Sequence, residues 1–225
     1  MTERRGTSYI FTSKELAVLL SAAGGNRLAG FSLQDAGQMD KSELVQKLHA
    51  LFKKGILRQK ENGEGLEILP ELRPVISSCV HAKRILRMER LYPERVSFAV
   101  CYPADGGWTV MRPCKEMPSG WLLEWMEPEA VLELLKDHEL LPPADDELQR
   151  VQERLVAYAG QEPEDQATPL LFLEWIDGSN GKQVAATRIL RGVLTDWMLT
   201  ADGKQAYMEQ RLVDWMKRFA GGAII

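Results

Sequence analysis

The stretch Pro169–Met198, PLLFLEWIDGSNGKQVAATRILRGVLTDWM, indicates how the second half of the chain folds. Two apolar runs rich in Leu, Ile, Val, Phe and Trp flank the short polar segment Asp177–Gly181. Such runs favour β-strands, and Gly and Asn tolerate the backbone angles that a tight reversal needs. The stretch therefore predicts a β-hairpin. Gly178–Lys182 lacks the spacing of a phosphate-binding loop and precedes no helix, so we interpret it as turn chemistry.

A second part of the sequence resembles the end of this stretch. The segment Gly120–Met126, GWLLEWM, resembles Gly192–Met198, GVLTDWM, and an amphipathic segment follows each. More coarsely, we expect a helix followed by three strands twice, once from Pro70 to Arg112 or Met126 and again over Asp145–Met198. The two comparisons give different alignments, and chance similarity between amphipathic strand ends is the alternative to a true repeat.

The N-terminal third predicts the element order of a winged helix. Thr12–Glu15 is a capping box that starts one helix, and Asp40 can cap a second. Ile56–Gln59 and Leu66–Leu69 then predict a two-stranded ribbon with a Gly-rich turn between them. We therefore expect residues 1–82 to form a winged-helix-like part.

The remainder, residues 83–225, predicts an antiparallel α+β part. We expect strands at Ile85–Leu91, Val96–Tyr102, Trp108–Arg112 and Trp121–Met126, and helices at Pro70–Ala82, Pro128–Asp137, Asp145–Ala159 and Lys204–Phe219. The predicted fold class is α+β, with a mostly antiparallel sheet and flanking helices. A pseudo-repeat boundary falls near 142–145, and one continuous domain is the alternative to two.

The composition is that of an ordinary globular protein. The 225 residues have a formal net charge of −4, which by itself points to neither nucleic acid nor membrane. Three cysteines without a CxxC motif favour a reducing, cytoplasmic setting over a disulfide scaffold. We expect no signal peptide, because no apolar run follows the first arginines, and no membrane span.

The sequence predicts no catalytic, cofactor or metal site. His49, His81 and His138 fall on separate predicted helices, without the partners at helical spacing that a metal site uses. Cys79 and Cys101 lie in apolar patterns that predict buried thiols, whereas Cys114 lies in a loop and is expected to be exposed. No base accompanies Cys114, so we expect a protein that is not an enzyme.

The tryptophans gather in the C-terminal half and are the candidate partner-binding residues. Trp121 and Trp125 share one face of a predicted strand with Leu123, because residues two apart point the same way. Trp175 and Trp197 lie on the strands of the opening stretch. We expect either a sheet covered on both faces or an exposed aromatic strip that binds a protein partner.

The winged-helix order also raises the alternative of a DNA-binding transcriptional regulator. Residues 1–95 have a net charge of +5, with 16 Lys or Arg against 11 Asp or Glu. The candidate phosphate-contacting residues lie on the second helix and the ribbon: Lys47, Lys53, Lys54, Arg58 and Lys60. This charge is mild, and the helix lacks the arginine that most often reads guanine. We therefore expect nucleic acid not to be the partner.

The N-terminal apolar pattern resembles the opening of EspG-like proteins, the cytosolic chaperones of type VII (ESX) secretion. The residues that carry the resemblance are Phe11, Thr12, Glu15, Leu16, Leu19 and Leu20, then Leu51 and Gly55–Leu57, and finally Leu66–Ile68. The family's quasi-twofold α/β fold would also suit a doubled helix-plus-strand unit. The resemblance implies a non-enzymatic protein that binds helical secretion substrates and keeps them soluble. It covers roughly the first 70 positions, and no substrate-contacting residue can be carried over.

Overall fold

The computed structural model describes residues 8–25, 28, 39–61, 63–117, 119–142, 167–193 and 195–220. These residues form five helices, one nine-stranded antiparallel sheet and one two-stranded sheet, which confirms the α+β class. The helix expected at Asp145–Ala159 lies outside the described residues.

The helices are α1 (Ser13–Ala22), α2 (Lys41–Lys53), α3 (Arg73–His81), α4 (Pro128–Asp137) and α6 (Glu209–Phe219). The large sheet contains β1 (Ser8–Thr12), β4 (Arg84–Arg90), β5 (Val96–Ala104), β6 (Gly107–Pro113), β7 (Gly120–Met126), β8 (Thr168–Asp177), β9 (Gln183–Arg191), β10 (Trp197–Thr200) and β11 (Gly203–Ala206). The small sheet is the ribbon of β2 (Leu57–Gln59) and β3 (Leu66–Ile68).

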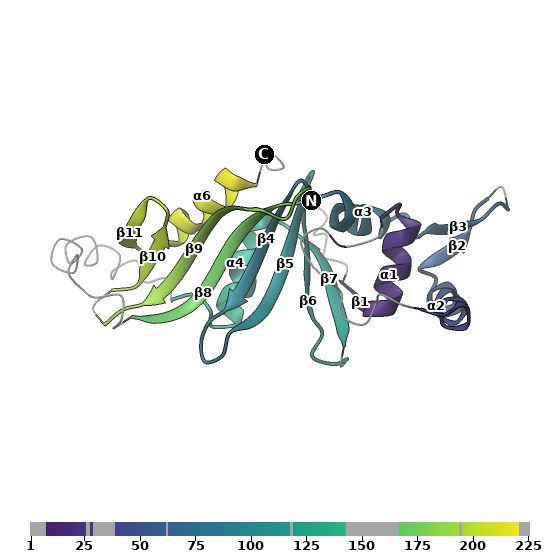
Figure 1. Ribbon diagram of the computed structural model, residues 1–225, viewed down its shortest axis with the longest axis horizontal. Coiled ribbons are helices and arrows are strands. Elements are labelled where there is room, and N and C mark those ends of the chain that lie inside the picture. The colour runs from purple at the N-terminus through teal and green to yellow at the C-terminus, as the bar shows by residue number, and fades with distance from the viewer. Residues whose placement is uncertain are drawn as a thin grey trace, which may run out of the picture.

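The large sheet has the strand order β1-β7-β6-β5-β4-β8-β9-β10-β11, and every neighbouring pair is antiparallel. Four strands, β4 to β7, run outward from the middle in sequence order and lead into α4. Four more, β8 to β11, run outward the other way and lead into α6 (Figure 1). The sheet is therefore two meanders joined at the antiparallel pair of β4 and β8.

This topology changes the predicted repeat. Each meander has four strands where three were expected, and each is followed by a helix. Gly120–Met126 is the fourth strand of its meander, whereas Trp197–Met198 begins the third strand of the other. The two similar Trp-Met sequences therefore occupy different positions in the two meanders.

Two apolar cores lie on opposite faces of the sheet. One core contains the buried faces of α4 and α6, and the other contains those of α1 and α3. Successive strand residues divide between them, as in β8, where Leu173 and Trp175 lie in the first core and Ile176 in the second. The first meander is consequently covered on both faces.

The N-terminal part is continuous with the rest of the molecule. Strand β1 pairs with β7 of the large sheet and not with the ribbon of β2 and β3. Residues of α1 and α3, such as Leu16 and Ile76, share a core with Tyr102 and Leu123 of the sheet. These contacts cross residue 82, the boundary predicted from the sequence between the two parts.

Two short strands at the sheet edges differ from the sequence expectation. The predicted helix Lys204–Phe219 begins only at Glu209, because Gly203–Ala206 pair with β10 as the edge strand β11. Gly203 has a φ of +122°, which suits the reversal between these strands. Strand β1 was not predicted, since its five residues gain their order from β7.

Candidate partner-binding surface

Helix α2 is held against α1 by charged contacts at both ends. Asp40 caps it by accepting a hydrogen bond from the Glu43 amide at 2.8 Å, as the sequence predicts. Lys14 Nζ lies 2.6 Å from Glu43 Oε1, and Lys54 Nζ lies 2.6 Å from Glu15 Oε1. Together these contacts fix which side of α2 faces α1.

Glu15, which forms the ion pair with Lys54, also belongs to the capping box of α1. Burial of Glu15 opposes its charge, but hydrogen bonds from Lys54 and Thr12 outweigh burial and lower its pKa. The Thr12 hydroxyl in turn accepts from the Glu15 amide at 3.2 Å. The predicted capping box is therefore confirmed, and it also anchors the end of α2.

Helix α2 has apolar residues that its contact with α1 does not cover. Leu51 is the one fully buried residue of this helix. Val45 is 57% exposed, Phe52 is 50% exposed and Leu44 is 39% exposed, and Leu48 is partly buried. Residues at spacings of three, four and seven share one side of a helix, so Val45, Leu48 and Phe52 form one line. We call these three residues the α2 stripe.

The α2 stripe lies at one end of the molecule. Figure 1 shows α2 beside the β2–β3 ribbon, at the end of the long axis opposite β10 and β11. The ribbon adds a further exposed apolar side chain, Leu66, which is 43% exposed. Because isolated exposed apolar residues are common, the significance lies in their alignment along one helix.

The five basic residues proposed for nucleic acid are not equivalent. Lys53, Arg58 and Lys60 are exposed, and Lys47 is half-buried. Lys54 is committed to the ion pair with Glu15. A helix that reads bases presents polar groups to the groove edge, whereas α2 presents an apolar stripe between its basic residues. Of the five residues, Lys53, Arg58 and Lys60 are thus exposed at the surface and lie outside the ion pair with Glu15.

The four candidate tryptophans do not form a single exposed strip. Trp175 is fully buried and meets Trp108 edge to face at 5.7 Å, and Trp197 is 2% exposed beneath the Lys204 ammonium. Trp121 and Trp125 are half-buried against the core that α1 and α3 cover. Of the two alternatives that the sequence leaves open, the covered sheet agrees with the burial of Trp175 and Trp197, and these two side chains do not belong to an exposed aromatic strip.

Trp121 has a specific structural contact. Its Nε1 donates a hydrogen bond to Ser13 Oγ at 3.0 Å, which connects β7 to the start of α1. An indole N–H that is removed from water needs such a partner. Trp121 therefore helps to join the N-terminal helices to the sheet.

All three cysteines are buried in this fold. Burial raises the pKa of Cys79 to about 12 and raises the pKa of Cys101 further above its ordinary value. Cys114 is 7% exposed, so the expectation that it is exposed is wrong; its Sγ lies 3.1 Å from Glu116 Oε2. The raised pKa keeps Cys79 and Cys101 protonated, and a protonated thiol is a poor nucleophile.

The histidines lie on separate elements, as the sequence predicts. His138 follows α4, where desolvation together with Lys115 and Arg112 lowers its pKa. Within the described part of the chain, no three His, Cys, Asp or Glu side chains come together in a way that could hold a metal ion. No helix in that same part is both long and apolar enough to cross a membrane.

Comparison with known proteins adds no assignment: no family model matches the chain, and no curated protein matches it either.

Proposed function

We propose that this chain is a non-enzymatic, cytosolic adaptor or chaperone that binds a protein partner through the α2 stripe. The observation that carries the proposal is the exposure of Val45 and Phe52 on a helix whose other side is fixed by two ion pairs. A continuous apolar line of this kind is typical of surfaces that receive an amphipathic helix. The resemblance to EspG-like chaperones points in the same direction, toward a helical secretion substrate.

The partner is expected to make contact along one side of α2. The exposed positions i and i+7, Val45 and Phe52, together with the partly buried Leu48 at i+3, can pack against the apolar line of a second helix by ridges into grooves. Lys53 and Lys41 lie exposed at the two ends of α2, so acidic residues at the margins of the partner would be favoured.

The test is co-purification from the native host with paired variants. Val45→Asp places a charge within the α2 stripe, whereas Val184→Asp places one on β9 at a residue that is 40% exposed. We expect the partner to be lost with Val45→Asp and kept with Val184→Asp. Equal recovery with both variants would refute the α2 stripe as the binding surface.

A gel shift tests the alternative that the chain is a DNA-binding transcriptional regulator. A gel shift with duplex DNA is expected to show no sequence-selective complex at moderate salt. Tight, salt-sensitive binding that is lost when Lys53, Arg58 and Lys60 are all changed to Ala would support the regulator instead.

A further inference from the structure

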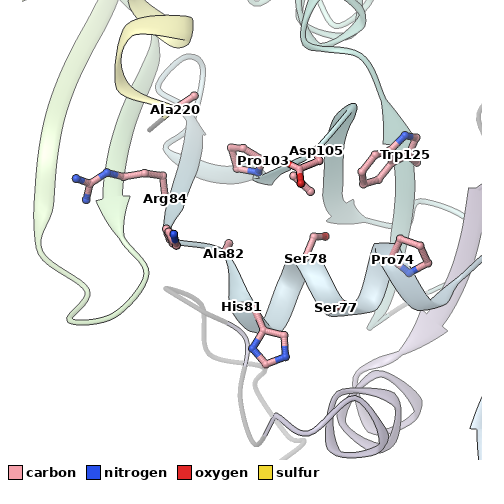
Figure 2. A pocket seen from close by; sticks show the side chains of 12 residues that line it. Pro74, Ser77, Ser78, His81, Ala82, Arg84, Pro103, Asp105, Trp125 and Ala220 are labelled. Carbon is pink, nitrogen blue, oxygen red and sulfur yellow. The ribbon is translucent and has the colours of Figure 1, made fainter. Parts of the chain in front are cut away.

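A second feature, separate from the α2 stripe, is a cavity of about 520 Å³ on the face that α3 covers. Helix α3 forms one wall, and the turn between β5 and β6 together with β7 forms the other (Figure 2). In Figure 2, Asp105 lies above Ser78 of α3, and Trp125 closes the end of the cavity near Pro74. The cavity thus brings together a carboxylate from the turn between β5 and β6 and an aromatic ring from β7.

Gly107 leaves room for the indole of Trp125. Trp125 is half-buried on β7, and a Cβ on Gly107 would lie only 2.7 Å from its Cε2 atom. No larger residue at position 107 would leave room for the ring where it stands. The glycine therefore allows the indole to lie against the β6 backbone while it still lines the cavity.

Asp105 supplies the negative charge. It is exposed in the turn between β5 and β6, and no described residue forms a hydrogen bond or ion pair with its carboxylate. The hydroxyl of Ser78 does not compete for it, since that hydroxyl lies 2.8 Å from Val75 O and 2.7 Å from Thr109 Oγ1. The carboxylate is accordingly available to a ligand.

The basic residues of the cavity lie toward its other end. Arg84 is paired with Asp177 at 2.8 Å and extends away from the cavity in Figure 2. Lys83 adjoins Arg84 and Ala82, which are drawn at the end far from Trp125, and it is exposed to solvent that screens its charge. His81 also points away from the space between Asp105 and Trp125. Among the described lining residues at the end near Trp125, Asp105 is thus the one charged side chain.

We propose that this end of the cavity binds an alkylammonium or guanidinium group, with the cation beside the Asp105 carboxylate and against the Trp125 ring. Aromatic faces attract such cations, Trp most strongly, and a neighbouring carboxylate adds a charge contact. The same chemistry is offered by a free small organic cation and by a Lys or Arg side chain of another protein. The site does not depend on the function proposed for the α2 stripe.

The test is a titration of the folded, ¹⁵N-labelled protein followed by nuclear magnetic resonance. The probes are n-butylammonium, n-butylguanidinium and, as the uncharged control, n-butanol. We expect both cations to shift the Trp125 indole and Gly106 amide signals saturably, and butanol to bind at least about threefold more weakly. Equal affinity for butanol, or no saturable shift with either cation, overturns the proposal.

A matched pair of variants tests the role of the carboxylate. The sequence Ala-Asp-Gly occurs at Ala104–Gly106 and again at Ala201–Gly203, in the turn between β10 and β11. We expect Asp105→Asn to weaken cation binding about fivefold and Asp202→Asn to leave it unchanged. An equal effect of the two variants contradicts a specific role for Asp105, because both remove one turn carboxylate.

A final comparison identifies the source of the cation. The probe is a blocked pentapeptide with one central Arg between glycines, measured beside n-butylguanidinium. Binding of the peptide at least tenfold tighter supports a protein side chain, because backbone contacts then add to the cation site. Equal or weaker binding of the peptide supports a free organic cation at the same site.

Discussion

Helices α2 and α6 both carry apolar residues along one side. In α6 that side is buried, whereas in α2 much of it is exposed. In α6, the residues Leu212, Val213, Trp215 and Met216 are all buried against α4 and the sheet. In α2, only Leu51 is fully buried, although the apolar line of the helix is as long. Periodicity shows that a helix has an apolar side, whereas the packing of its neighbours decides whether that side stabilises the fold or remains available to a partner.

The largest expected effect is at the buried helix. Met216→Ala removes a side chain that is 0% exposed and leaves a cavity between α6 and the sheet. We expect the free energy of unfolding to fall by about 2–5 kcal/mol, measured by urea denaturation. A loss below about 1 kcal/mol would mean that α6 is packed no more tightly than α2, and the comparison would fail.

A smaller effect is expected where the N-terminal helices join the sheet. Thr12→Ala removes the hydroxyl that caps α1 directly after strand β1. We expect a loss of about 1 kcal/mol in the free energy of unfolding, because an amide of the first helical turn loses its acceptor. Thr200→Ala serves as the control: Thr200 ends strand β10, its hydroxyl accepts from the Asp202 amide in a solvent-exposed hydrogen bond, and the change in stability is expected to be less than about 0.5 kcal/mol.

The contact between α1 and α2 should depend on pH. The folded-state pKa of Glu15 is lowered from its ordinary value of 4.5, so its ionised form stabilises the fold above that pH. This contribution is lost as the pH falls below about 4.5 and through the folded-state pKa. We expect Glu15→Gln to lower stability at pH 7 and to converge with the unmodified protein in acid. A stability difference that is constant from pH 7 to acid would show that the Glu15 charge does not hold α2.

The smallest effect on stability is expected for Phe52 of the α2 stripe, and this variant tests most directly whether α2 differs from α6. Phe52→Ala removes a side chain that is 50% exposed, so the free energy of unfolding should change by no more than about 0.5 kcal/mol. Binding of the protein partner should nevertheless weaken, as measured by quantitative pull-down against the unmodified chain. If Phe52→Ala destabilised the fold as strongly as Met216→Ala, the α2 stripe would be part of the core and not a docking surface.

Features that depend on residues close together in the sequence could be predicted from it. The capping box of Thr12 and Glu15, the bounds of α4 and the turn at Asp177–Gly181 all follow from local side-chain and backbone chemistry. The structure agrees with the sequence at each of these points.

Features that depend on distant partners could not be predicted. Strands β1 and β11 are short, and their order comes from pairing with β7 and β10. The exposure of Phe52 and the burial of Trp175 likewise depend on which elements pack nearby. Apolar residue types occur in cores and on docking surfaces alike, so the sequence placed the candidate partner-binding residues on tryptophans that the fold partly buries.

The pairing of β4 with β8 has a consequence for the order of folding. Arg84 and Asp177, which lie opposite each other at one end of this pair, are 93 positions apart in the chain. Neighbouring strands within each meander are instead connected by short turns, so little chain entropy is lost when they pair. We expect the two meanders to form separately, and β4 to pair with β8 last.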